Sequence, residues 1–130
     1  MKAITKIVVV FAALAAFAQT AMAQENPNAV AAGQIAAVVV SLNHVPSDAD
    51  KATLNAIANN GELVQAVRDM AAAVAGINHA ASDDAKAKMA AIQADANTPD
   101  RGKMLAGVIA SINHRASDEV KAQLTTAYSL

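Results

Sequence analysis

One short motif occurs three times in this chain, and its copies are 35 residues apart. Each copy reads apolar-Asn-His-x-x-Ser-Asp, with its asparagine at Asn43, Asn78 or Asn113. A constant interval of this length is typical of a structural repeat, whose units fold alike and pack against their neighbours. The units 26–60, 61–95 and 96–130 reach the last residue, so the repeat dominates what the chain can fold into.

Apolar side chains recur at helical spacing inside each unit. In the second unit, a stripe with intervals of four and three residues predicts a helix over 62–77; its members are Leu63, Val67, Met70, Val74 and Ile77. A second helix is expected after each Asn-His pair, and the alanine-rich composition also favours helix. The sequence therefore predicts an all-α fold with about six helices in three helical-hairpin repeats, each joined at its Asn-His turn. A short α-solenoid and a compact six-helix bundle both fit this pattern.

The residues around each Asn-His turn are suited to helix ends. Asparagine tolerates the left-handed backbone conformation that often follows a helix, so the Asn of each motif is expected to adopt it. The serine of the motif can accept a hydrogen bond from a free N–H of the next helix, and the following Asp suits the positive end of the helix dipole. In the third unit, Thr98 is the expected N-cap, with Pro99 in the first helical turn.

The helix predicted at 29–42 carries no charge, and its polar side chains are those of Gln34 and Ser41. A helix that is apolar on all sides is normally buried. At the end of an open array one flank would be exposed, so the rest of a closed bundle, a second copy or a different protein must cover it. If another chain covers it, we expect the interaction surface to consist of Ile35, Val38, Val39 and Leu42.

The first 23 residues have the features of a cleaved secretory signal peptide. Lys2 and Lys6 precede an apolar run at 7–18, and Ala21 and Ala23 are the small residues that favour cleavage after Ala23. The run is shorter than the ~20 residues that cross a bilayer, so no stable membrane insertion is expected after cleavage. The mature chain, 24–130, is predicted to be a single domain that is periplasmic or secreted.

Composition and missing motifs limit the classes of function. Lys2 and Lys6 leave with the signal peptide, so the mature chain has 11 acidic and 8 basic side chains. With this net negative charge, nucleic acid is not an expected partner. The chain has no cysteine, no Gly-x-Ser-x-Gly sequence and no phosphate-binding loop. We therefore predict a protein that is not an enzyme, with no catalytic residues and no cofactor.

The repeated histidines and aspartates are the candidate metal ligands, because imidazole and carboxylate both bind transition metals. The set is His44, His79, His114, Asp48, Asp83 and Asp118. In an open stack, equivalent atoms of neighbouring units lie roughly 9–10 Å apart, whereas a zinc ligand lies about 2.0–2.1 Å from the ion. The three histidines can therefore meet only if the hairpins close around an axis. Helix capping is the first interpretation of these residues, and metal binding is the alternative.

Two functions follow from these patterns. The first is an exported, non-catalytic protein that binds a protein partner or itself through a helical face, as an envelope adaptor, assembly subunit or regulator. The alternative is a periplasmic protein that binds a metal ion or a small ligand at the repeated His-x-x-Ser-Asp turns. The sequence leaves the partner, the biological process and the oligomeric state open.

Overall fold

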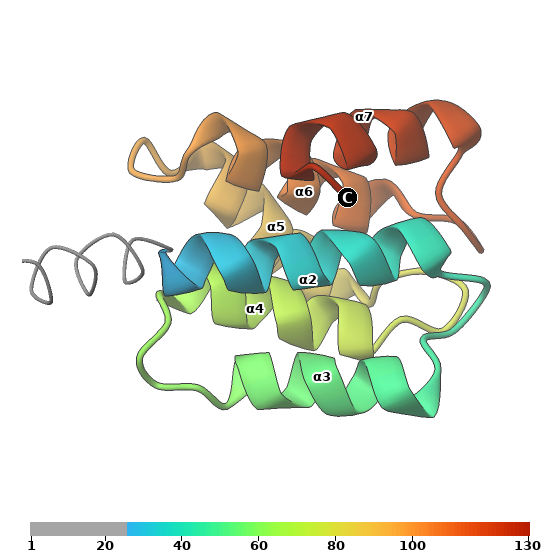
Figure 1. The fold of residues 1–130 in the computed structure, drawn as a ribbon, viewed down its shortest axis with the longest axis horizontal. Coiled ribbons are helices and arrows are strands. Elements are labelled where there is room, and N and C mark those ends of the chain that lie inside the picture. The colour runs from blue at the N-terminus through green and yellow to red at the C-terminus, as the bar shows by residue number, and fades with distance from the viewer. Residues whose placement is uncertain (1–25) are drawn as a thin grey trace, which may run out of the picture.

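The computed structural model describes residues 26–130, and these fold into six α-helices (Figure 1). The helices are α2 (Pro27–Ser41), α3 (Asp48–Ala58), α4 (Gln65–Ala75), α5 (Asp83–Ala94), α6 (Asp100–Ser111) and α7 (Asp118–Tyr128). The predicted all-α fold with about six helices is confirmed. The predicted signal peptide, 1–23, lies outside the described residues. None of the described helices combines the length and the apolar character that crossing a membrane requires.

Three helices begin in the same way, directly after an Asn-His turn. The hydroxyl groups of Ser47, Ser82 and Ser117 accept hydrogen bonds of 3.1, 3.2 and 3.2 Å from the N–H three residues later. These bonds satisfy donors that the first turn of a helix leaves free, and an Asp follows each serine. The predicted serine caps of α3, α5 and α7 are therefore present.

The start of α6 differs from the prediction. Pro99, with an extended backbone (φ −59°, ψ 152°), is the N-cap of this helix, and no side chain caps it. Thr98 instead belongs to the preceding turn, because its N–H donates to the carbonyl of Asp95 at 3.1 Å. Helix α4 also lacks a side-chain cap at Val64, so two of the helices that precede Asn-His turns start without one.

The helices pair across the other connections rather than across the Asn-His turns. Helix α3 packs along α4, and α5 packs along α6, whereas the two helices that flank each Asn-His turn contact each other less. The hairpin boundaries therefore lie half a repeat away from the predicted ones. The physical reason is that each Asn-His turn leads the chain from a central helix, α2, α4 or α6, to a peripheral one.

The first and last helices complete the third pair. Helix α2 packs against α7 on one side and α4 on the other, so the array closes on itself (Figure 1). The four residues predicted to bind another chain are consequently inside the bundle; Ile35, Val38, Val39 and Leu42 are 0%, 5%, 0% and 3% exposed. This corrects the prediction of an interaction surface at these positions, because closure within one molecule covers the apolar helix.

The core lies between the three central helices, which contact one another. Ala36, Ala71 and Ala106 occupy equivalent positions on these helices and are fully buried, so the backbones can approach closely. The neighbouring layers hold larger side chains, and they consist of Ile35, Met70 and Leu105 and of Val39, Val74 and Ile109. Equivalent residues of the three repeats thus meet around a common axis.

Candidate metal centre

The three Asn-His turns meet at one end of the bundle, on the right in Figure 1. Their backbones form a closed triangle of hydrogen bonds. The N–H of His44 donates to the carbonyl of His114 (2.6 Å), that of His114 to His79 (2.5 Å) and that of His79 to His44 (2.8 Å). The condition set by the sequence, that the histidines converge only if the hairpins close around an axis, is therefore met.

Each histidine has a left-handed backbone conformation, with φ of 68° at His44, 69° at His79 and 70° at His114. The sequence predicts the left-handed conformation at the asparagine of each motif. This prediction is wrong by one residue, because the histidine adopts it. The triangle explains the shift, because it needs both the N–H and the carbonyl of the histidine to face the axis.

This conformation costs a non-glycine residue on the order of 1 kcal/mol or more, and glycine adopts it freely. The three repeats differ at most positions, yet all three retain histidine here. Backbone strain of this kind makes the three histidines candidates for a functional role.

The three imidazole rings lie against one another at the exposed end of the axis. Their centroids are 5.2 Å apart for His44 and His79, 5.2 Å for His44 and His114, and 4.9 Å for His79 and His114. Each ring offers one nitrogen that lies within 4.8 Å of the corresponding nitrogens of the other two. Nitrogens bound to one tetrahedral zinc ion lie about 3.3 Å apart, since each Zn–N bond is about 2.0–2.1 Å. Sharing one ion therefore requires ring nitrogens that are farther apart than this to move closer together.

Two neighbouring asparagines determine which ring nitrogen is available. The Nδ1–H of His44 donates to Oδ1 of Asn43 at 2.6 Å, and that of His114 donates to Oδ1 of Asn113 at 2.6 Å. An amide oxygen only accepts, so Nδ1 carries a proton, and in the neutral ring the lone pair is then on Nε2. Metal-binding histidines commonly have a partner of this kind on the other nitrogen. The described part of the structure shows no such bond for His79.

The aspartates of the motif do not join the histidines. Asp48, Asp83 and Asp118 are the first residues of α3, α5 and α7, and the group of potential ligands within reach of one another contains the three histidines alone. The aspartates instead stand at the positive ends of these helix dipoles. The structure thus brings together half of the residues that the sequence proposed as ligands.

The central helices also favour a cation at this end. Helices α2, α4 and α6 all end directly beneath the histidines, and the C-terminal end of a helix carries a partial negative charge. The residue after each histidine is Val45, Ala80 or Arg115, so one of the three turns carries a positive side chain.

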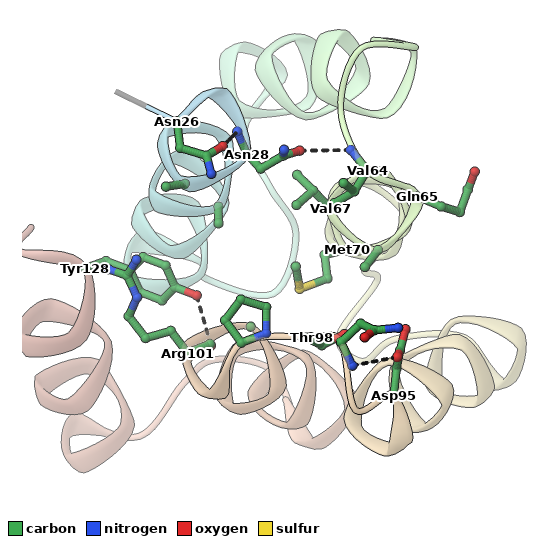
Figure 2. Close-up of a pocket in the computed structure, with 16 residues that line it drawn as sticks. Asn26, Asn28, Val64, Gln65, Val67, Met70, Asp95, Thr98, Arg101 and Tyr128 are labelled. Atoms are coloured by element: carbon green, nitrogen blue, oxygen red, sulfur yellow. Dashed lines mark hydrogen bonds between the residues drawn. The ribbon is translucent and has the colours of Figure 1, made fainter. Parts of the chain in front are cut away.

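A cavity of about 510 Å³ lies at the opposite end of the central helices (Figure 2). It is lined by the first turns of α2, α4 and α6, with Met70 deep inside and the hydroxyl of Tyr128 donating to the carbonyl of Arg101 at its edge (2.9 Å). Burial raises the pKa of Tyr128, and the positive charge of Arg101 opposes this shift. The sequence contains a signal for the cavity, because Ala32 and Gly102, two of the three equivalent lining residues, are small.

The chain matches no protein-family model, no curated protein and no solved structure. A functional assignment therefore depends on the chemistry of its own residues. Of the two ends of the axis, the histidine end has the same polar residues in all three repeats, and the cavity end does not.

Proposed function

We propose that this protein binds a divalent transition metal ion through His44, His79 and His114. The observation that supports the proposal is the convergence of three imidazole rings whose available nitrogens lie within 4.8 Å of one another. The strained backbone of each histidine, the partners of two Nδ1 atoms and the helix C-termini beneath the rings all favour the same interpretation.

The donor set indicates which metals the site would take. Neutral imidazole nitrogens suit Zn²⁺, Cu²⁺, Ni²⁺ and Co²⁺, whereas Mg²⁺ and Ca²⁺ prefer oxygen ligands. No carboxylate belongs to the group, and the chain has no cysteine. We therefore expect selection for a borderline transition metal, with zinc as the simplest occupant because it accepts three protein ligands in a tetrahedral site.

Metal binding has more support than binding to another protein through the first helix. The prediction of a protein partner rests on the apolar helix at 29–42, which needs a second surface to cover it. In the closed bundle, α4 and α7 cover this helix. The proposed export is compatible with a metal site, since the predicted signal peptide would place the protein in the periplasm or outside the cell. We accordingly propose an exported metal-binding protein.

Thermal unfolding with and without Zn²⁺ tests the proposal. Binding to the folded state alone should stabilise the protein by about 2.7 kcal/mol at a free Zn²⁺ concentration of 100 times Kd. For a domain of this size that corresponds to a rise in Tm of roughly 10 °C.

Two matched triple variants identify the ligands. Replacing His44, His79 and His114 with glycine should abolish the rise in Tm while keeping the fold, because glycine accepts the left-handed backbone. Replacing the three motif aspartates with asparagine should leave the rise intact, because they lie in the first turns of the peripheral helices and not among the histidines. A wild-type Tm that Zn²⁺, Cu²⁺, Ni²⁺ and Co²⁺ all fail to change would refute metal binding.

A further inference from the structure

We propose that a metal ion bound by the three histidines keeps a coordination position open on its solvent side and binds a small anion there. This inference rests on the metal site proposed above and adds its fourth ligand. Structural zinc sites usually have four protein ligands, whereas sites with three leave the fourth position to water or to another small molecule. The question is therefore whether this chain provides a fourth ligand.

No carboxylate and no further imidazole lies with the three histidines. Among the described histidine, aspartate and glutamate side chains, the group at this place consists of His44, His79 and His114 alone. The amide oxygens of Asn43 and Asn113 already accept the Nδ1–H of the neighbouring ring. The residues that follow the histidines are Val45, Ala80 and Arg115, and neither alkyl groups nor a guanidinium has a lone pair to donate. The nearest carboxylates in the sequence, those of the motif aspartates, are at the starts of the peripheral helices.

The open position must face the solvent. On the protein side, the triangle of hydrogen bonds between the histidine backbones closes the axis, and each histidine carbonyl in it already accepts an N–H. The rings themselves are exposed. A metal ion held by the three Nε2 atoms would therefore lie on the outer side of the triangle, with its remaining position directed away from the bundle.

The spacing of the rings favours one open position over three. Nitrogens on adjacent positions of an octahedral ion lie about 3 Å apart, closer than the roughly 3.3 Å of a tetrahedral one. Because the ring centroids are 5.2, 5.2 and 4.9 Å apart before any metal binds, the wider tetrahedral arrangement requires the smaller movement of the rings. A tetrahedral ion with three histidines has a single position left.

The local charge favours an anion at that position. Three neutral imidazoles leave the full positive charge on a bound divalent ion, and Arg115 adds a permanent positive charge directly after His114. The other two turns have Val45 and Ala80 at this place, so no carboxylate in the turns opposes the anion. Hydroxide, azide and other small monodentate anions have the chemistry that this position would accept.

The test uses Co²⁺ as a spectroscopic substitute for zinc and azide as the anion. The purified protein in chloride-free buffer is titrated first with Co²⁺, and visible absorption reports how many ligands surround the ion. Intense visible bands that saturate at one Co²⁺ per chain are expected, as for a four-coordinate ion. Azide should then change these bands with a saturating dependence on its concentration.

Arg115→Ala is the matched variant, because it gives the third turn the residue that the second turn has at Ala80. The variant should keep the Co²⁺ bands and bind azide roughly two- to five-fold more weakly, which is the usual size of an exposed charge interaction. Equal azide affinity in the variant would contradict the contribution of Arg115. A variant without two ring ligands, His44→Gly with His79→Gly, should lose the bands altogether.

The outcomes separate this inference from the function on which it rests. If Co²⁺ produces no bands and no rise in Tm, the metal site itself is refuted. If the bands appear at one Co²⁺ per chain and azide leaves them unchanged, the metal site stands and the open position is refuted. Weak bands typical of six-coordinate Co²⁺ would likewise contradict a single open position.

Discussion

The two ends of the central helices differ in what the three repeats have in common. At the C-terminal ends the Asn-His sequence is identical in every repeat, and the histidine backbones join in one triangle. At the N-terminal ends the equivalent residues are Ala32, Val67 and Gly102, and a cavity of about 510 Å³ lies between the helices. The three repeats thus share their polar residues at the histidine end, where the three turns meet. They differ at the cavity end, where the equivalent side chains differ in size.

The electrostatic environments of the two ends are also opposite. Helix C-termini beneath the histidines favour a cation, whereas the cavity lies at helix N-termini, which do not. The cavity is lined by both an acidic and a basic side chain, Asp95 and Arg101. The C-terminal ends of the three central helices therefore suit a metal ion. At their N-terminal ends, the sizes of the lining side chains determine the shape of the cavity.

Breaking the closure of the bundle should have the largest effect and should affect both ends. Val39 is fully buried on α2, so Val39→Asp places a carboxylate without a partner in the core. We expect a loss of more than about 4 kcal/mol in unfolding free energy, enough to unfold many domains of this size. Circular dichroism during thermal unfolding measures it.

The control for this variant is on the same helix. Val30 is 43% exposed, so Val30→Asp adds the same charge to α2 without burying it, and it should change the unfolding free energy by less than about 0.5 kcal/mol. Similar losses in the two variants would show that α2 is not held inside the bundle as described.

Removing the asparagine partners should weaken the histidine end without unfolding the bundle. Asn43→Ala and Asn113→Ala each remove the acceptor for an Nδ1–H, and losing such a partner typically reduces metal affinity 10- to 100-fold. Asn78→Ala is the internal control, since the described structure has no such bond at His79, and its effect should be smaller. Isothermal titration with Zn²⁺ compares the three, and equal losses would contradict the asymmetry.

The sequence predicted local structure better than the contacts between distant segments. The helices, the serine caps and the condition for the histidines to meet all follow from periodicity and residue type within one repeat. The contact between α2 and α7 does not follow from the repeat. A repeating sequence gives the first and last units the same apolar surfaces whether the array is open or closed.

Two smaller differences between the predicted and the observed structure also come from contacts between different repeats. Asparagine and histidine are adjacent in the motif, and local preference favours asparagine for the left-handed conformation. Hydrogen bonds between three different repeats place it at the histidine instead. The cavity is lined by Ala32, Val67 and Gly102, which are far apart in sequence, so the pattern of a single helix does not reveal it.

Filling the cavity should stabilise the protein and leave the histidine end unchanged. Ala32→Leu adds apolar volume where the equivalent position of α4 already holds Val67, and cavity filling of this kind commonly gains about 0.5–2 kcal/mol. Gly102→Leu should gain less, because a Cβ there would lie 3.0 Å from Cγ2 of Thr98. Urea unfolding measures both. A reduced Zn²⁺ affinity in Ala32→Leu would show that the two ends are coupled.

The smallest expected effect concerns the pH dependence of Tyr128, the one tyrosine in the chain. Burial at the cavity raises the pKa of Tyr128 above its ordinary value of 10.0, and Arg101 lowers it in part. A folded-state pKa above the unfolded one contributes stability that is complete below about pH 10 and is lost as the pH rises through the folded-state value.

Tyrosinate absorbance follows this group directly, and its midpoint in the folded protein should lie above pH 10. Arg101→Gln should raise the midpoint further, because it removes the positive charge that favours tyrosinate. Tyr128→Phe should lack the corresponding loss of stability at high pH, because phenylalanine has no proton to lose. A midpoint at or below pH 10 would contradict the burial of the Tyr128 hydroxyl at the cavity edge.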